Sequence, residues 1–303
     1  MKLTLVKGNT YVLEGEELIP LYKVGENQCI LLDTGLLIER QDLEDSLQQY
    51  GLTPIGVLTS HAHVDHCANN GYLQEKYGTK VAMTFPEAGM CSTVSTLKCY
   101  FLTLTPGIVE RESVCMVHTP DVIIPSKDCD FEFCGVNFGI IQTPGHSSGH
   151  ICVVTPDDVC YVADALLSRE NQDAKLPYAL HHAAAFQSRA KLGRTRHAWY
   201  IIAHRGVCPG ADFPALVRDN DALVLRRAEE ILSLVKGTMS FSEINRTVCA
   251  HYKLLTRQPR RSLRFERNVR FFVEYLVDEG HLAMSCEDGA TLYAPTGKSF
   301  SFA

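Results

Sequence analysis

The sequence predicts an α/β fold that is extended by a smaller, mainly helical C-terminal part. Over the first two-thirds of the 303 residues, short apolar runs typical of strands alternate with segments of helical spacing. The last third contains three helical segments and one hairpin pattern. Several strand-like runs end directly in His or Asp. Polar side chains at strand ends are typical of functional sites on such sheets.

The strands of the first part are short apolar runs that turn residues separate. They are expected at residues 3–6, 10–13, 19–22, 29–32, 55–59, 81–83, 131–133, 136–141, 151–154, 159–163 and 198–202. Helices are expected at residues 38–50, 67–77, 86–97 and 178–192, and Gly51 and Gly78 are expected to end the first two. Residues 100–118 carry no pattern that favours either structure.

The turn-rich segment 209–214 predicts a boundary between domains 1–210 and 211–303. Beyond it, helices are expected at residues 219–235, 241–251 and 261–278. Ser240 and Glu243 have the spacing of a capping box at the start of the second helix. Strands at 281–284 and 291–294 flank a turn sequence and predict a hairpin. Three helices followed by a hairpin is the order of a winged helix.

Composition excludes several classes of protein. The net charge is -6, which argues against a polycation built for nucleic acid or anionic membranes. The N-terminal apolar stretch is too short for a secretory signal, and no apolar run is long enough to cross a bilayer. The 12 cysteines include no Cys-x-x-Cys pair and are expected to be reduced residues of a cytoplasmic protein.

The run from Ser60 to His66 places four metal-binding side chains within six residues. These side chains are His61, His63, Asp65 and His66. Imidazole and carboxylate are ligands for zinc and other first-row divalent ions. So dense a polar cluster is a poor choice for ordinary packing, because each buried polar group needs a partner.

Three further candidate ligands lie at strand ends or in a glycine-rich turn. They are His146, Asp164 and His204, which bring the set to seven. A structural zinc site is normally closed by four ligands, often cysteines. Seven imidazole and carboxylate groups exceed that need and favour a catalytic metal site.

The ordered set of these motifs resembles the metallo-β-lactamase superfamily over roughly residues 3–210, including the segment 31–35 before the metal loop. The resemblance implies a four-layered αββα sandwich that holds two metal ions. It implies that His61, His63 and His146 bind the first ion and that Asp65, His66 and His204 bind the second. Asp164 would bridge the two ions, and Asp65 would also act in catalysis by holding or accepting a proton.

With such a bridging aspartate, the chain resembles glyoxalase II, lactonases and nuclease relatives of the superfamily more than true β-lactamases. The resemblance therefore implies that a bridging hydroxide cleaves a small ester, thioester or lactone. Zinc is the favoured ion, with iron or manganese as alternatives for nitrogen and oxygen ligands. A redox role is disfavoured, since flavin-partnered members carry a carboxylate where this chain has His63. The oligomeric state is left open.

The other candidate residues receive more ordinary interpretations. Asp33 is expected to orient a ligand histidine, and His150 to lie behind the ligands. His181 and His182 are expected on a solvated helix face. Cys67 and Cys208, near motif positions without occupying them, are expected to be core residues or to lie behind the ligands.

An arginine-rich tract that leads into the last expected helix and continues along it leaves two alternatives open. It comprises Arg257, Arg260, Arg261, Arg264, Arg267 and Arg270. These residues motivate a phosphodiesterase or ribonuclease activity, or a nucleic-acid-binding role for the C-terminal domain. The favoured interpretation is a solvated helix face or a cleft wall that attracts an anionic small molecule, since the overall charge is acidic.

Overall fold

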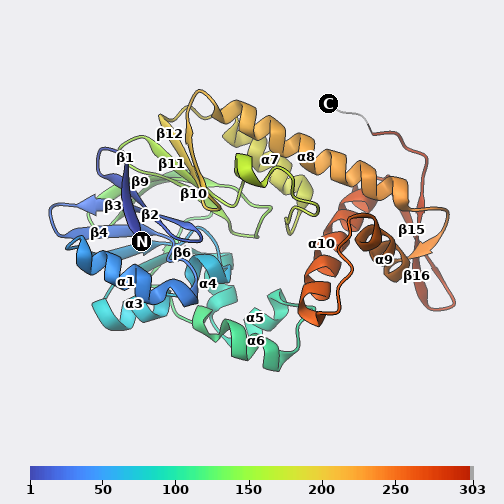
Figure 1. The fold of residues 1–303 in the computed structure, drawn as a ribbon, viewed down its shortest axis with the longest axis horizontal. Coiled ribbons are helices and arrows are strands. Elements are labelled where there is room, and N and C mark those ends of the chain that lie inside the picture. Colours follow the sequence, from blue (N-terminus) through green and yellow to red (C-terminus); the bar gives the residue numbers. More distant parts are fainter. Residues whose placement is uncertain (301–303) are drawn as a thin grey trace.

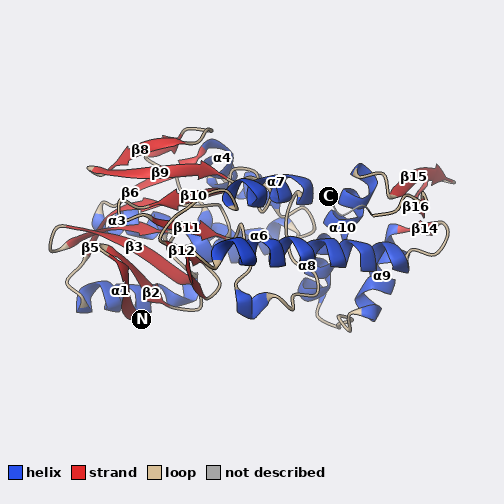
Figure 2. Ribbon diagram, turned by 90° about the horizontal axis from the view of Figure 1, so that it is seen from above, coloured by secondary structure: helices blue, strands red, loops and turns tan. Residues whose placement is uncertain are grey.

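The computed structural model describes residues 1–300 and contains two large β-sheets (Figures 1 and 2). The seven-stranded sheet has the order β1-β2-β3-β4-β5-β6-β7, and the six-stranded sheet has the order β13-β12-β11-β10-β9-β8. The strands of the first are Lys2–Lys7, Thr10–Glu14, Leu18–Val24, Gln28–Leu32, Thr53–Leu58, Lys80–Thr84 and Val122–Ile124. Those of the second, from β8 to β13, are Cys129–Phe133, Val136–Gln142, Ile151–Val154, Val159–Ala163, Trp199–Ile202 and Gly206–Pro209.

The central strands are buried on both faces, which explains their continuous apolar sequences. In β4, Ile30 and Leu32 join the core between the two sheets, whereas Cys29 and Leu31 face the opposite side. The same alternation in β11 places Tyr161 between the sheets. Side chains point alternately to the two faces of a strand, so one apolar run serves two cores.

Helices cover both outer faces of the paired sheets. The outer face of the seven-stranded sheet packs against α1 (Arg40–Gln49), α3 (Asn70–Tyr77), α4 (Phe85–Cys91), α5 (Val94–Tyr100) and α6 (Pro106–Ser113). The outer face of the six-stranded sheet packs against α7 (His182–Leu192) and the start of α8 (Phe213–Leu234). The predicted four-layered αββα sandwich is therefore confirmed.

The C-terminal part follows the predicted order of helices and hairpin. After α8 come α9 (Phe241–His251), α10 (Pro259–Asp278), β15 (Leu282–Glu287) and β16 (Ala290–Pro295). The short strand β14 (Met239–Ser240) pairs with β16. The expected capping box is present, since Ser240 N–H donates to Glu243 Oε2 at 2.8 Å and Glu243 N–H donates to Ser240 Oγ at 3.4 Å. That this part forms a winged helix stays a prediction.

Helix α8 connects the sandwich to the C-terminal part (Figure 1). Its first turns bury Phe213 and Leu216 against the six-stranded sheet. Its later turns bury Ala228 and Ile231 in a separate core with α9 and α10. One continuous helix therefore belongs to two cores and links their positions.

Several element boundaries differ from those expected. The single helix expected at residues 86–97 is two helices, α4 and α5, because Thr93 caps a new helix with a hydrogen bond from Thr96 N–H at 3.0 Å. Residues 100–118, which carried no pattern, include helix α6. Strands β7 and β13 lie where no strand was expected. The described helices include none with the length and apolar character needed to cross a membrane.

Candidate metal centre

The seven predicted ligands lie on loops where strands of the two sheets end. Residues 60–63 follow β5, and the short helix α2 (Val64–Cys67) continues this segment. Asp164 directly follows β11, and His204 follows β12 by two residues. His146 lies on the loop between β9 and β10. Because the two sheets face each other, these loops lie close together.

The first group of side chains meets around three imidazole nitrogens. His63 Nδ1 lies 2.9 Å from His61 Nε2 and 2.9 Å from His146 Nε2. Asp164 Oδ2 lies 3.3 Å from His146 Nε2 and 3.9 Å from His61 Nε2. The four ligand atoms lie within 4.8 Å of one another, as in a cluster that could hold one ion.

The second group meets around the other side of Asp164. Its Oδ2 atom lies 3.2 Å from His204 Nε2 and 3.6 Å from His66 Nε2. Asp65 Oδ2 lies 3.7 Å from His204 Nε2 and 3.8 Å from His66 Nε2. These four atoms also lie within 4.8 Å of one another. One carboxylate oxygen, Asp164 Oδ2, therefore belongs to both groups.

Unpartnered polar atoms indicate that this donor set fits cations. His66 Nε2 and Asp164 Oδ1 are buried and have no hydrogen-bond partner within residues 1–300. Buried polar atoms without partners are costly, and bound metal ions remove that cost. Nitrogen and carboxylate oxygen are also the ligand types that zinc, iron and manganese accept.

The protonation states favour metal binding in the first group. Burial, followed by the neighbouring rings, lowers the pKa of His61 well below its usual value, and burial lowers the pKa of His146 to about 4. Both rings are therefore neutral at pH 7, which is the form that binds metal. Burial opposes ionisation of Asp164, but the surrounding histidines outweigh it and hold its pKa well below the usual value.

Asp33 contacts His66, one of the predicted ligands, as expected from the sequence. Its Oδ2 atom lies 2.8 Å from His66 Nδ1 and also accepts hydrogen bonds from Ser60 Oγ at 2.5 Å and Tyr161 O–H at 2.7 Å. Asp33 adopts a left-handed backbone conformation with φ 67°, which Asp tolerates better than most residues. This carboxylate fixes the orientation of the His66 ring from behind.

Two glutamates with supporting roles were missed in the sequence. Glu17 Oε1 lies 2.7 Å from His204 Nδ1. Glu87 of α4 accepts hydrogen bonds from Ala62 N–H at 2.7 Å and Gly149 N–H at 2.6 Å. Glu87 therefore joins the first ligand loop to the loop of His146. Neither residue lies in a recognisable motif, so only the tertiary structure reveals it.

Aromatic residues form one wall of the site, and the sequence did not single them out. Tyr100 of α5 hydrogen-bonds to Nε2 of His63, and its hydroxyl lies 3.1 Å from that of Tyr178. The Tyr178 ring lies 4.9 Å from the His146 ring. Arg267 of α10 stacks over the Tyr178 ring at 4.3 Å. One residue of the arginine tract therefore lies beside the centre.

The sequence profile of the metallo-beta-lactamase superfamily matches residues 3–204 of this chain. The chain belongs to this superfamily. The matched range contains all seven residues of the metal-binding cluster. It ends before the C-terminal helices, so the profile says nothing of their role.

Curated relatives of this superfamily member match part of its length. A hydroxyacylglutathione hydrolase from Rhizobium meliloti is 30% identical over 131 residues, which are 43% of this chain and 41% of the relative. The corresponding enzyme from Shewanella pealeana is 27% identical over 124 residues, or 41% of this chain and 37% of the relative. The matched stretch thus spans less than half of each relative.

Solved structures share the fold over nearly the whole chain. A metallo-beta-lactamase family protein from Thermus thermophilus has a TM-score of 0.71 at 20% identity and covers 97% of this chain and 98% of its own. A beta-lactamase domain protein from Burkholderia ambifaria has a TM-score of 0.73 at 16% identity, covering 97% and 94%. The C-terminal helices and hairpin therefore belong to a recurring form of the metallo-beta-lactamase fold.

The expectations for the other histidines and cysteines are met except at His182. His150 lies behind the cluster as expected, where Asp164 N–H donates to its Nε2 at 3.3 Å. His181 is exposed, but His182 is not on a solvated face, because α10 packs over its ring through Phe272. Cys67 and Cys208 are buried as expected.

Proposed function

We propose that this superfamily member is a hydrolase with two divalent ions and that it cleaves a small thioester, ester or lactone. The observation that carries the proposal is the position of Asp164 Oδ2 between two groups of ligand atoms, each within 4.8 Å. Separate groups joined through one carboxylate are what two neighbouring ions require. A single structural ion needs fewer ligands.

His61, His63 and His146 would hold one ion, and Asp65, His66 and His204 the other, with Asp164 shared between them. When bound, such ions lower the pKa of a shared water and polarise the substrate carbonyl. The nitrogen and carboxylate-oxygen ligands suit zinc, iron and manganese alike, and zinc is the first ion to test.

The protein side chains orient the reactants and move the proton. Asp33 and Glu17 hold the rings of His66 and His204 by their Nδ1 atoms, so each ring directs Nε2 into the site. The Asp65 side chain is 23% exposed and lies at the open side of the cluster. Its carboxylate is therefore placed to hold a proton from the attacking water, which makes Asp65 the proposed catalytic residue.

A thioester is the first substrate class to test, because the curated relatives are named hydroxyacylglutathione hydrolases. The purified protein should be loaded with zinc and screened against thioester, ester, lactone, lactam and phosphodiester substrates. We expect hydrolysis of a small acyl compound. Exclusive cleavage of the lactam or the phosphodiester would contradict the proposal.

Metal analysis tests the shared role of Asp164. We expect two equivalents of metal in the unaltered protein and no more than one in Asp164→Ala, because both groups lose a ligand. Elemental analysis after desalting measures both proteins. A single tightly bound equivalent in the unaltered protein would count against a bridging Asp164.

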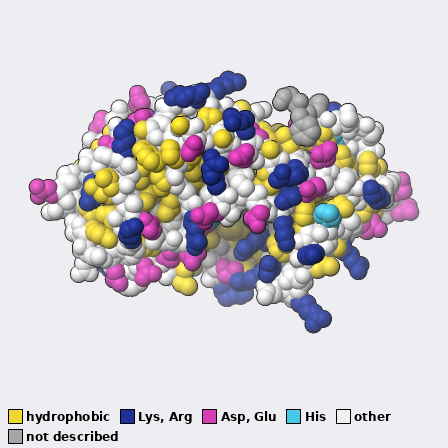
Figure 3. All heavy atoms as spheres, turned by 45° about the horizontal axis from the view of Figure 1, so that its top comes forward, with side chains coloured by type: hydrophobic (Ala, Val, Ile, Leu, Met, Phe, Trp, Pro, Cys, Tyr) yellow, Lys and Arg dark blue, Asp and Glu magenta, His cyan; other side chains and the backbone are white. Residues whose placement is uncertain are grey.

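A phosphodiester-cleaving activity has one observation in its favour. Arg267 stacks over Tyr178 beside the metal-binding cluster, and Lys and Arg side chains gather around a hollow of the surface (Figure 3). Two other arginines of the tract have local partners, since Arg260 pairs with Glu112 of α6 and Arg270 lies over the Phe241 ring. Nucleic-acid binding measured across salt concentrations distinguishes the two functions, because phosphate contacts give a steep salt dependence. Binding without such a dependence, or no binding, supports the small-molecule substrate.

Two further parts of the proposal concern the chain as a whole. The first is the division into domains 1–210 and 211–303, although α8 contributes residues to the cores of both. Limited proteolysis would test this boundary by cleavage near residues 209–214.

The second is a cytoplasmic location. The 12 unpaired cysteines support it, because thiols persist in reducing compartments.

A further inference from the structure

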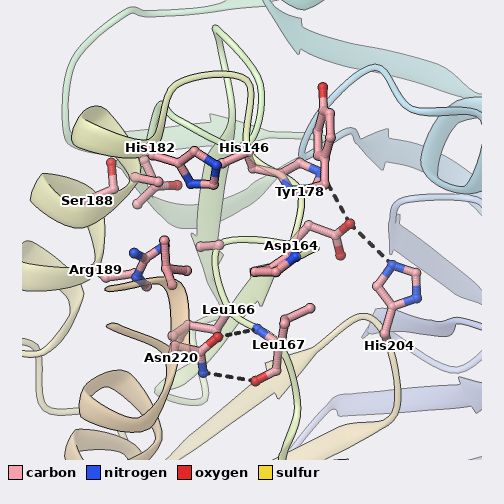
Figure 4. Close-up of a pocket in the computed structure, with 16 residues that line it drawn as sticks. His146, Asp164, Leu166, Leu167, Tyr178, His182, Ser188, Arg189, His204 and Asn220 are labelled. Atoms are coloured by element: carbon pink, nitrogen blue, oxygen red, sulfur yellow. Dashed lines mark hydrogen bonds and ion pairs between the residues drawn. The ribbon is translucent and has the colours of Figure 1, made fainter. Parts of the chain in front are cut away.

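A cavity of about 90 Å³ extends from the metal-binding cluster towards α7 and α8 (Figure 4). His146, Asp164 and His204 line it on the side of the cluster, while His182, Ser188 and Arg189 line it on the side of α7. The cavity has room for a small acyl group. Its contents would therefore lie next to the atoms at which hydrolysis takes place.

Arg189 is a buried cation that lines this cavity and has an unused hydrogen-bond donor. Only 5% of the residue is exposed. Its Nε donates to Asp221 Oδ1 at 2.5 Å, but Nη2 is buried and has no partner in the part of the chain that the structure describes. Buried guanidinium groups normally have all sides hydrogen-bonded, most strongly to carboxylates. Nη2 therefore lacks an acceptor, and a ligand in the cavity that Arg189 lines could supply one.

His182 adds a second unpartnered group beside Arg189. The residue is 2% exposed, and neither ring nitrogen has a hydrogen-bond partner within residues 1–300. Burial lowers the pKa of His182 to about 3, so the ring is neutral and offers one donor and one acceptor. Ser188 does not compete for a ligand, because its hydroxyl donates to the Pro144 carbonyl at 2.7 Å.

We propose that this cavity receives the acyl group of the substrate and that this acyl group ends in a carboxylate bound by Nη2 of Arg189. The proposal rests on the proposed function, since the scissile carbonyl must lie at the metal-binding cluster. His182 would donate a second hydrogen bond to the same carboxylate. A dicarboxylic monothioester is therefore a better substrate than a neutral thioester of equal size.

The kinetic test uses thioesters that share one thiol, N-acetylcysteamine, and differ only in the acyl end. Malonyl, succinyl and glutaryl thioesters are compared with the corresponding monoamides, which have the same shape without the charge. For the best chain length we expect kcat/KM of the carboxylate to exceed that of its amide about 10- to 100-fold, as for hydrogen bonds to charged groups. Equal values across all three lengths would overturn the proposal.

Variants of Arg189 test whether this side chain causes the preference for an acyl group that ends in a carboxylate. Arg189→Gln should lose most of the carboxylate preference and change kcat/KM for the amides less than about threefold. Because Gln leaves Asp221 unpaired, the double variant Arg189→Gln with Asp221→Asn is measured alongside, and thermal melting checks both folds. Arg194→Gln, at an exposed position just after α7, is the matched control and should behave as the unaltered protein. A preference that survives in the folded Arg189 variants refutes the role of this residue.

A binding measurement separates this proposal from the proposed function. Calorimetry with zinc-loaded protein compares the free dicarboxylate of the same chain length with its monoamide. We expect the dicarboxylate to bind at least about tenfold tighter, and this difference to disappear in Arg189→Gln but to persist in Arg267→Gln. If the difference in affinity disappears in Arg267→Gln and persists in Arg189→Gln, the acyl group does not bind in this cavity. If binding follows Arg189 but no thioester is hydrolysed, the proposed activity fails while the carboxylate site stands.

Discussion

The Asp33 carboxylate and the His66 ring form a buried pair in which Oδ2 lies 2.8 Å from Nδ1. This contact leaves His66 Nε2 as the atom that faces the metal-binding cluster. Asp33→Asn should therefore lower the affinity for the second ion by about 10- to 100-fold, because the ring loses the carboxylate that orients it. Competition with a chelator of known affinity measures the change.

Tyr161→Phe is the control for this prediction. It removes one hydrogen bond to Asp33 and leaves the carboxylate in contact with His66. We expect a smaller loss of affinity in this variant. Equal affinities of the Asp33→Asn and unaltered proteins would show that the pair does not orient the ligand.

Asp65→Ala and His63→Ala should each abolish hydrolysis while the fold survives. Both side chains lie in loop or short-helix segments at the cluster and contribute little to the apolar cores. The measurements are kcat/KM for the best substrate and the circular dichroism of each variant. His251→Ala, at an exposed position at the end of α9, is the control. Full activity in either cluster variant would refute its assignment.

Gly145 packs against α7 and should not tolerate a side chain. Its φ is 135°, and an added Cβ would lie 2.3 Å from the Ala185 backbone nitrogen. Gly145→Ala should reduce the free energy of unfolding by about 1–3 kcal/mol, because either the loop of His146 or α7 must shift. Urea unfolding measures the loss. In Gly89→Ala the added Cβ meets no heavy atom within 4 Å, so this control should be neutral or stabilising.

Glu44 should make the stability depend on pH. Burial would raise the pKa of its carboxyl, but hydrogen bonds from Lys76, Tyr77 and Tyr72 outweigh it and lower the pKa below its ordinary value. A carboxyl with a lowered pKa stabilises the fold above its unfolded-state pKa of about 4.3. This contribution is lost as pH falls through the lower pKa of the folded state.

Urea unfolding of Glu44→Gln at several pH values tests this expectation. The variant should have a lower midpoint than the unaltered protein at pH 7, and the difference should shrink as pH falls below about 4.3. Glu75→Gln, at an exposed position of the neighbouring helix α3, should show no such convergence. A constant difference at all pH values would exclude the ionised Glu44 carboxylate as the cause.

The local elements could be predicted where the sequence pattern and burial agree. The double-sided strands β4 and β11 are continuous apolar runs because each face enters a different core. The hairpin of β15 and β16 could be predicted from Asp288-Gly289, which adopt φ 48° and 79° in the turn. In contrast, the break between α4 and α5 could not be predicted from apolar spacing, because it depends on the Thr93 side chain, which caps a new helix.

The sequence by itself determined the superfamily and the seven candidate ligands, because metal chemistry restricts residue types and strand ends restrict their positions. Only the tertiary structure decided that Glu17 and Glu87 support the ligand loops, that Tyr178 and Arg267 line the site, and that His182 is buried. These contacts join residues far apart in the chain and depend on how the helices pack over the sheets. Local sequence patterns do not predict such packing.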